Sequence, residues 1–170
     1  MHIPRTIKIT KCRLCFNDKL LKLYSFGNLL VSNFVAKKDI NKGIKAPLDL
    51  VYCKNCKLLQ LQHSAPQEIM YKQFYWYRSG ITNTMKNALK DIFLTVKKMS
   101  ILDKNDTILD IGANDGTLLG YFKKEKYITI GCEPAKNLTK ILKKNCKYIL
   151  NGFWNSKDLK KILKTKKIKK

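Results

Sequence analysis

The chain has 170 residues, of which 45% are apolar, so a packed core is available. Its net charge of +23 would suit a nucleic-acid partner, but arginine occurs only at Arg5, Arg13 and Arg78, and the lysines are spread along the chain. An AT-rich genome explains this bias better than nucleic-acid binding does. No apolar run is long enough for a membrane span, and MHIPRTIKITKC lacks a signal-peptide core. We therefore expect a cytoplasmic protein with no membrane partner, and nucleic acid is the least favoured partner.

Residues 1–62 contain two cysteine pairs with two residues between the members of each pair, in CRLC and CKNC. Each such spacing lets both sulfurs of a tight turn point at one ion, and two turns complete a tetrahedral shell. A long insertion between the pairs is tolerated because the cost of loop closure grows slowly with length. The sequence predicts an α+β zinc-binding domain with structural Zn²⁺ bound by Cys12, Cys15, Cys53 and Cys56.

Redox-active or buried inert thiols are the alternatives for these cysteines. A redox CxxC normally lies alone in a βαβ context, whereas here two pairs lie outside one. Four cysteine ligands leave no open position, so this metal would hold the fold and do no chemistry. His2 and His63 are then not needed as ligands, and we interpret both as ordinary surface or packing residues.

Residues 63–104 form a predicted helical connector. Pro66 and Glu68 mark a helix start. After the aromatic stretch YKQFYWYRSG, the segment ITNTMKNALKDIFLTVKKM has helical spacing that places on one face Met85, Leu89, Ile92, Phe93 and Val96.

Residues 105–170 alternate predicted strands and helices: TILDI, GTLLGYFKKEK, YITIGCE, AKNLTKILKKN, KYILN and a lysine-rich amphipathic tail. This repeated β-α-β pattern predicts a parallel sheet of the doubly wound kind.

The turn after the first of these strands reads Asp110-Ile-Gly112-Ala-Asn114-Asp-Gly116. Glycines there leave room for a ligand beside the backbone and before the free N–H groups of a helix start. A dinucleotide site usually has G-x-G-x-x-G, but here the middle glycine is replaced by Asn114. Asp115 would also repel a phosphate. A ligand without phosphates fits better, and S-adenosylmethionine is one.

Glu133 ends the next predicted strand, in IGCEPA. An acidic residue at this place can accept hydrogen bonds from both ribose hydroxyls of an adenosine. The combination of the glycine turn with Glu133 favours a cofactor site over a bare structural turn.

CRLC, VYCKNCKLLQLQ, YWYRSG, ILDIGANDGTLL and IGCEPAKN, in this order, resemble the sugar C-methyltransferases that act on nucleotide-activated deoxysugars. The resemblance covers about residues 10–154. It implies an N-terminal zinc-binding domain followed by a partial α/β Rossmann-like domain of the class I methyltransferase kind, truncated after about three strands. Residues 105–170 would be the N-terminal half of the S-adenosylmethionine-binding domain.

By position in these motifs, the resemblance implies that Asp110, Gly112 and Gly116 line the methionine end of the cofactor, with Asn114 in the same turn. Glu133 would hold the ribose. The segment of Tyr75, Tyr77 and Ser79 would lie near cofactor and sugar, with the two tyrosines on the substrate side and Ser79 on the cofactor side.

Two features depart from the family pattern. The third strand usually ends with an acid before an aromatic pair, but here Gly152 precedes Phe153 and Trp154, which leaves the adenine contacts open, with Asn151 as a substitute. The fourth strand and the Glu-His segment linked to proton transfer would begin past Lys170, so the general base is unassigned. The first strand of the sheet would then expose an apolar edge.

We therefore expect the N-terminal part of a longer or split methyltransferase, inactive alone. Its partners would be a nucleotide-sugar substrate and a second chain supplying the other half-domain, with a gene fragment as an equal alternative. Rival hypotheses are a non-catalytic zinc-ribbon binding module and, last, a nucleic-acid-binding ribbon, since base-reading arginines are lacking.

Overall fold

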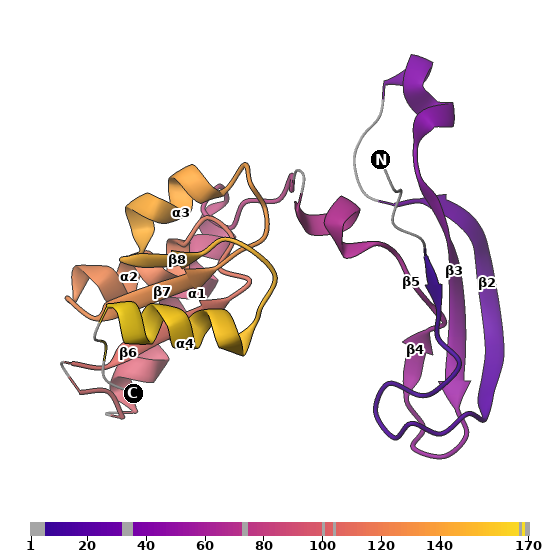
Figure 1. Cartoon of the computed structure of the whole chain (residues 1–170), viewed down its shortest axis with the longest axis horizontal. Helices are drawn as coiled ribbons and strands as arrows, with labels where there is room; N and C mark the ends of the chain where they lie inside the picture. The colour runs from indigo at the N-terminus through magenta and orange to yellow at the C-terminus, as the bar shows by residue number, and fades with distance from the viewer. Residues whose placement is uncertain are drawn as a thin grey trace. The chain divides into compact units, whose positions relative to one another are not determined.

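The computed structural model describes residues 6–31, 36–72, 75–99, 101–103, 105–166 and 168. The chain divides into two compact units, Met1–Met70 and Tyr71–Lys170, which we describe separately (Figure 1). The finer division into 1–62, 63–104 and 105–170 stays a prediction. No helix within the described ranges is long and apolar enough to cross a membrane. His2 lies outside the described residues.

The first unit contains a three-stranded antiparallel sheet in the order β2-β3-β4, formed by Leu20–Leu30, Lys45–Cys53 and Leu59–Leu61. In Figure 1 the long strands β2 and β3 run side by side. A short 3₁₀ helix, Lys37–Lys42, lies between them in sequence, and a small second sheet pairs β1 (Ile7–Lys8) with β5 (His63–Ser64). The strand, knuckle, strand arrangement expected around CKNC is present.

The more buried face of this sheet is partly polar. On β3, Asp49, Val51 and Cys53 are buried, whereas the alternating apolar residues on the other face are half-buried. Ser25 Oγ and Lys22 Nζ both donate hydrogen bonds to the Asp49 carboxylate. The hydroxyl of Ser25 and then the ammonium of Lys22 hold the pKa of Asp49 below its ordinary value.

The second unit is built on a parallel sheet in the order β6-β7-β8, formed by Thr107–Ile111, Ile128–Cys132 and Tyr148–Leu150. All three predicted strands are therefore present and parallel, as the alternating pattern indicated. Within the described residues β6 pairs only with β7, so β6 is an edge strand.

Helices cover both faces of the parallel sheet. On one face α2 (Thr117–Lys124) and α3 (Thr139–Asn145) bury Leu119 and Leu142 against Ile108 and Ile149. Side chains alternate along a strand, so Leu109 and Ile130 point to the opposite face. There α4 (Ser156–Thr165) brings Leu159 and Leu163 to the same hollow as these two residues.

Helix α1 (Asn83–Lys98) packs beside α2. The Thr82 side chain caps its start by accepting from the Met85 N–H, and the rings of Phe93 and Phe122 meet edge to face at 5.0 Å. Of the predicted apolar face, Ile92 is the exception, with 49% of its surface exposed, because it lies at the edge of the stripe farthest from Phe93. The helix start expected near Pro66 is one π-helical turn, Glu68–Lys72.

Candidate functional site

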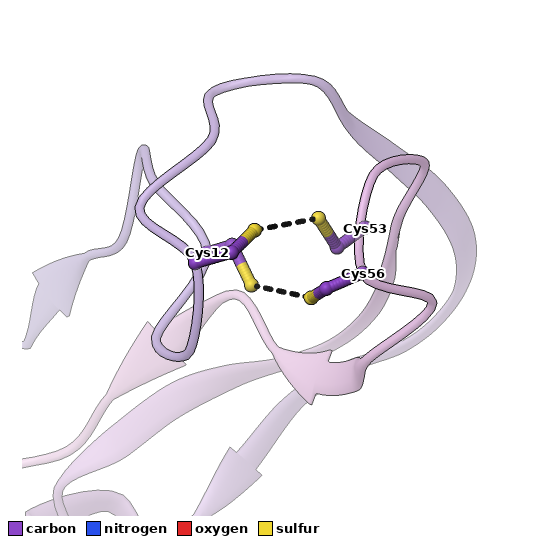
Figure 2. A group of neighbouring side chains, drawn as sticks. Cys12, Cys53 and Cys56 are labelled. Atoms are coloured by element: carbon purple, nitrogen blue, oxygen red, sulfur yellow. Dashed lines mark hydrogen bonds between the residues drawn. The ribbon is translucent and has the colours of Figure 1, made fainter.

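The cysteine pairs lie on two knuckles of matching backbone geometry. In the first, the Phe16 N–H donates to the Cys12 carbonyl at 3.0 Å, and in the second the Lys57 N–H donates to the Cys53 carbonyl at 3.0 Å. Phe16 and Lys57 both have positive φ, 60° and 68°, which turns the chain sharply after the second cysteine. Figure 2 shows the loop of Cys12 facing the turn that carries Cys53 and Cys56.

The four sulfurs converge on one point. All lie within 4.8 Å of one another, with Cys12 Sγ 3.4 Å from Cys56 Sγ and Cys15 Sγ 3.6 Å from Cys53 Sγ. A tetrahedral zinc with Zn–S bonds of about 2.3 Å needs sulfurs about 3.8 Å apart, so the cluster fits this ion. All four are free thiols, which excludes a disulfide framework among them.

The charge state of the cluster also fits a bound cation. The Asn55 side chain and then the Asn17 backbone lower the pKa of Cys15 to about 6. At Cys56 the backbone hydrogen bond with Leu58 lowers the pKa of the thiol. Burial and the three neighbouring thiols outweigh this effect and raise the pKa of Cys56 to about 12. Four thiolates in this space need a compensating positive charge, which a bound zinc ion would supply.

His63 lies apart from the metal cluster. Its Nδ1 is 3.8 Å from the Asp49 carboxylate. The set of neighbouring metal-ligating side chains found among the described residues contains the four cysteines alone.

The glycine turn of the second unit joins β6 to α2 and is tied to β7. The N–H groups of Gly112 and Ala113 both donate to the Cys132 carbonyl, at 2.9 and 3.0 Å. Gly112 has φ +80° and open space where a Cβ would stand. A side chain here would enter the space that a ligand could occupy.

Glu133 is the polar centre beside this turn, only 6% exposed. Its Oε2 accepts from the Asn114 N–H and its Oε1 from the Ala135 N–H, both at 2.8 Å. Each carboxylate oxygen has a second lone pair, so a fixed Glu133 can still accept from a ligand hydroxyl.

An open cleft of about 490 Å³ lies over the carboxyl ends of β6 and β7. Six of the predicted cofactor and substrate residues line it: Tyr75, Tyr77, Ser79, Gly112, Asn114 and Glu133. The remaining lining residues, which the motifs did not assign to a ligand, are Tyr71, Ile111, Cys132, Pro134, Gly152, Phe153 and Trp154. The glycine found in place of the third-strand acid therefore borders the same cleft as the aromatic pair, whereas Asn151 is not among the lining residues.

Two predicted cofactor residues lie away from the cleft lining. Gly116 has φ +77°, and a Cβ there would stand 2.7 Å from Leu142 Cδ1 and 2.9 Å from Asn145 Cβ. It is therefore needed where α2 packs against α3. Asp110 is half-buried at the end of β6, and burial and then the charge of Glu133 raise its pKa. Both cofactor roles stay predictions.

Asp115 is a structural residue that sequence reasoning assigned only a repulsive role. It is 1% exposed, and its Oδ1 accepts from the Thr117 N–H at 3.1 Å and hydroxyl at 2.6 Å at the start of α2. Its Oδ2 accepts from the Gly80 N–H at 2.8 Å. In the sequence, an acidic residue two positions before a predicted helix start is the signal that could have indicated this bonding to the first residue of α2.

Comparison with known proteins gives two findings. Residues 12–71 match a family model described as "putative zinc binding domain". The chain is 29% identical over 132 residues to the C-methyltransferase NovU of Streptomyces niveus. That match covers 76% of this chain but 31% of the relative, so the chain spans about a third of the relative's length.

The zinc-type knuckles, the family match over them and the similarity to a C-methyltransferase agree with each other. They support the resemblance of this chain to the N-terminal region of a sugar C-methyltransferase.

Proposed function

We propose that the chain forms the zinc-binding part and the first half of the S-adenosylmethionine site of a methyltransferase that C-methylates a nucleotide-activated keto-deoxysugar. The observation that carries this proposal is the cleft in which the β6 glycine turn, the fixed carboxylate of Glu133 and the tyrosine segment meet. Its volume of about 490 Å³ lies in the usual range of cofactor pockets.

The electrostatics of the cleft favour a ligand that carries positive charge. Asp110 and Glu133 lie close enough for the charge of Glu133 to raise the pKa of Asp110. S-adenosylmethionine carries a sulfonium, an ammonium and one carboxylate, hence a net positive charge, and has no phosphate, so it relieves this repulsion where a dinucleotide would add to it. The parallel sheet with helices on both faces supports the assignment of a Rossmann-like fold to the second unit.

The cofactor would supply the methyl group. A 4-keto group acidifies the neighbouring sugar C–H, a general base removes that proton, and the resulting carbanion forms the new C–C bond as the S–CH₃ bond breaks. In this scheme Glu133 holds the ribose, while Tyr75 and Tyr77 orient the sugar. The general base is assigned to none of the described residues.

We further propose that another β-strand, from the rest of the enzyme or from a second chain, completes the sheet beside β6. The support is the unpaired edge of β6, whose Ile111 is 53% exposed, and the hollow of about 480 Å³ between β6, β7 and α4. Apolar strand edges of this kind pair with another segment or aggregate. The chain alone is then expected to bind cofactor without completing the reaction.

Isothermal titration of S-adenosylmethionine into the zinc-loaded full chain tests the proposal. We expect a micromolar Kd that Glu133→Ala weakens beyond detection, while Glu125→Ala, an exposed carboxylate paired with Lys97, leaves it unchanged. A folded, zinc-loaded chain with no affinity for S-adenosylmethionine would refute the cofactor assignment and favour a non-catalytic zinc module. Methyl transfer to a keto-deoxysugar nucleotide by the chain alone would refute its inactivity.

A further inference from the structure

Two asparagines make the same pair of hydrogen bonds to the backbone of the tyrosine segment. Asn114 Oδ1 accepts from the Ser79 N–H and its Nδ2 donates to the Tyr77 carbonyl, both at 3.0 Å. Asn137 Oδ1 accepts from the Tyr75 N–H and its Nδ2 donates to the Tyr75 carbonyl, again both at 3.0 Å. Asn114 lies in the loop after β6 and Asn137 in the loop after β7, so residues 75–80, here called the anchored segment, are bonded to the loops that follow both strands.

Only a primary amide satisfies both partners at each position. The segment presents one backbone donor and one backbone acceptor, and an amide presents the complementary acceptor and donor. An ionised carboxylate of the same size would lack the donor, and a leucine would lack both. The backbone partners also fix which amide atom is oxygen and which is nitrogen.

A third anchor holds the end of the segment. The Asp115 carboxylate accepts from the Gly80 N–H at 2.8 Å, and Arg78 Nε lies 3.9 Å from the same oxygen. A Cβ on Gly80 would stand 2.5 Å from Thr117 Oγ1 and 2.8 Å from Asp115 Oδ2. The close approach of the segment to the start of α2 therefore requires glycine at position 80.

We propose that Asn114 and Asn137 are positioning residues that hold the anchored segment as a preformed wall of the cleft. Their bonds use backbone groups alone, which leaves the side chains of Tyr75 and Tyr77 to line the cleft. A wall that is ordered before binding spares the ligand the entropic cost of ordering a loop. The preformed wall stands on the geometry, whereas its effect on ligand affinity rests on the proposed function.

Hydrogen exchange by NMR on the unmodified, zinc-loaded chain without ligand tests the wall directly. The amides of Tyr75, Ser79 and Gly80 donate to anchor side chains, so we expect them to be protected. Among the described residues the Arg78 amide donates no backbone or side-chain hydrogen bond, so it is the internal control and should exchange fast. Equal exchange at all four amides would overturn the inference.

Variants of Asn137 separate positioning from general stability. Losing one net hydrogen bond corresponds to about tenfold, so Asn137→Leu should lower the protection of Tyr75 at least about tenfold while the Ile130 amide in β7 stays protected. Asn137→Asp keeps the acceptor and should keep part of the Tyr75 protection.

The matched control is Asn105→Leu in the exposed turn before β6, which should change neither the Tyr75 nor the Ile130 amide. Unchanged Tyr75 protection in Asn137→Leu would overturn the anchor. If this variant does not fold, Asn137→Asp takes its place, since it loses the bond to the Tyr75 carbonyl, and Tyr75 protection equal to that of the unmodified chain would then overturn the anchor.

Titration of the same variants distinguishes the two proposals. We expect Asn137→Leu to weaken S-adenosylmethionine binding about tenfold in step with the loss of protection. Lost protection with unchanged affinity would overturn the positioning role. A protected segment in a chain that binds no S-adenosylmethionine would leave the wall in place and refute the proposed function instead.

Discussion

The Glu133 carboxylate accepts a hydrogen bond from the Asn114 backbone N–H at 2.8 Å and thereby joins the end of β7 to the turn after β6. Its other oxygen accepts from the Ala135 N–H, so one buried side chain fixes both the turn after β6 and the backbone that follows β7. Glu133 therefore has a structural task in addition to its proposed contact with a ribose, and we expect variants at this position to lower stability as well as affinity.

Replacing Glu133 by glutamine should lower the free energy of unfolding by about 1–3 kcal/mol, because the new amide nitrogen faces one of two buried N–H donors. Urea unfolding measures the change. The control Glu125→Gln removes an exposed ion pair with Lys97, so it should cost less than about 1 kcal/mol. Equal losses in the two variants would contradict the two-bond role of Glu133.

The order of strands and helices in the second unit was predictable because each element has its own local pattern. The strands TILDI and ITIGC and the helix between them follow directly from periodicity. The cluster of four cysteines was equally predictable, since knuckle spacing is local to each pair. Long-range distances were not needed for either prediction.

The anchors were not predictable because they join residues far apart in the sequence. Asn137 and Tyr75 lie on separate segments, and nothing in either segment alone indicates an amide–backbone bond. Gly116 illustrates the same limit, since a glycine that packs against α3 looks identical in sequence to one that faces a ligand. In the zinc unit, alternation located β3 but could not show that Asp49 lies on its buried side.

Removing one zinc ligand should abolish metal binding and unfold the first unit. Cys53→Ser leaves three sulfurs, so the chain should lose much of the roughly 10–16 kcal/mol that structural zinc contributes in small zinc domains. Metal analysis after gel filtration and the exchange of β3 amides report the two effects. Cys146→Ser, a buried thiol of the second unit, is the control and should retain the metal. Full zinc content in Cys53→Ser would contradict the four-cysteine site.

Alanine at the two turn glycines should separate packing from ligand access. Gly112→Ala meets open space and should cost only about 1–2 kcal/mol for its positive φ. Gly116→Ala has the same backbone strain and also meets Leu142 and Asn145, which should add about 1–3 kcal/mol. Thermal unfolding compares the stabilities of the two variants. In S-adenosylmethionine titration, Gly112→Ala should lose more affinity than Gly116→Ala, because only Gly112 lines the cleft. A lower stability for Gly112→Ala than for Gly116→Ala would contradict the packing role.

Asp110 should make stability depend on pH in the direction opposite to a salt-bridged aspartate. Burial and the charge of Glu133 raise its pKa in the folded state, so the folded chain binds the Asp110 proton more tightly than the unfolded chain does. The free energy of unfolding therefore falls as pH rises from the ordinary aspartate pKa through the raised one, and the loss is complete above the raised pKa.

Asp110→Asn removes this titration. The variant should be more stable than the wild type at pH 7, and the advantage should shrink as pH falls towards pH 4, because Asp110 becomes increasingly protonated in both states. Urea unfolding from pH 4 to 8 checks the difference, with Asp91→Asn on the exposed side of α1 as the control. If the proposed cofactor is correct, the same variant should bind S-adenosylmethionine more weakly, since it loses a carboxylate near the cationic groups. A variant that is less stable at pH 7 and more stable at pH 4 would contradict the assigned direction.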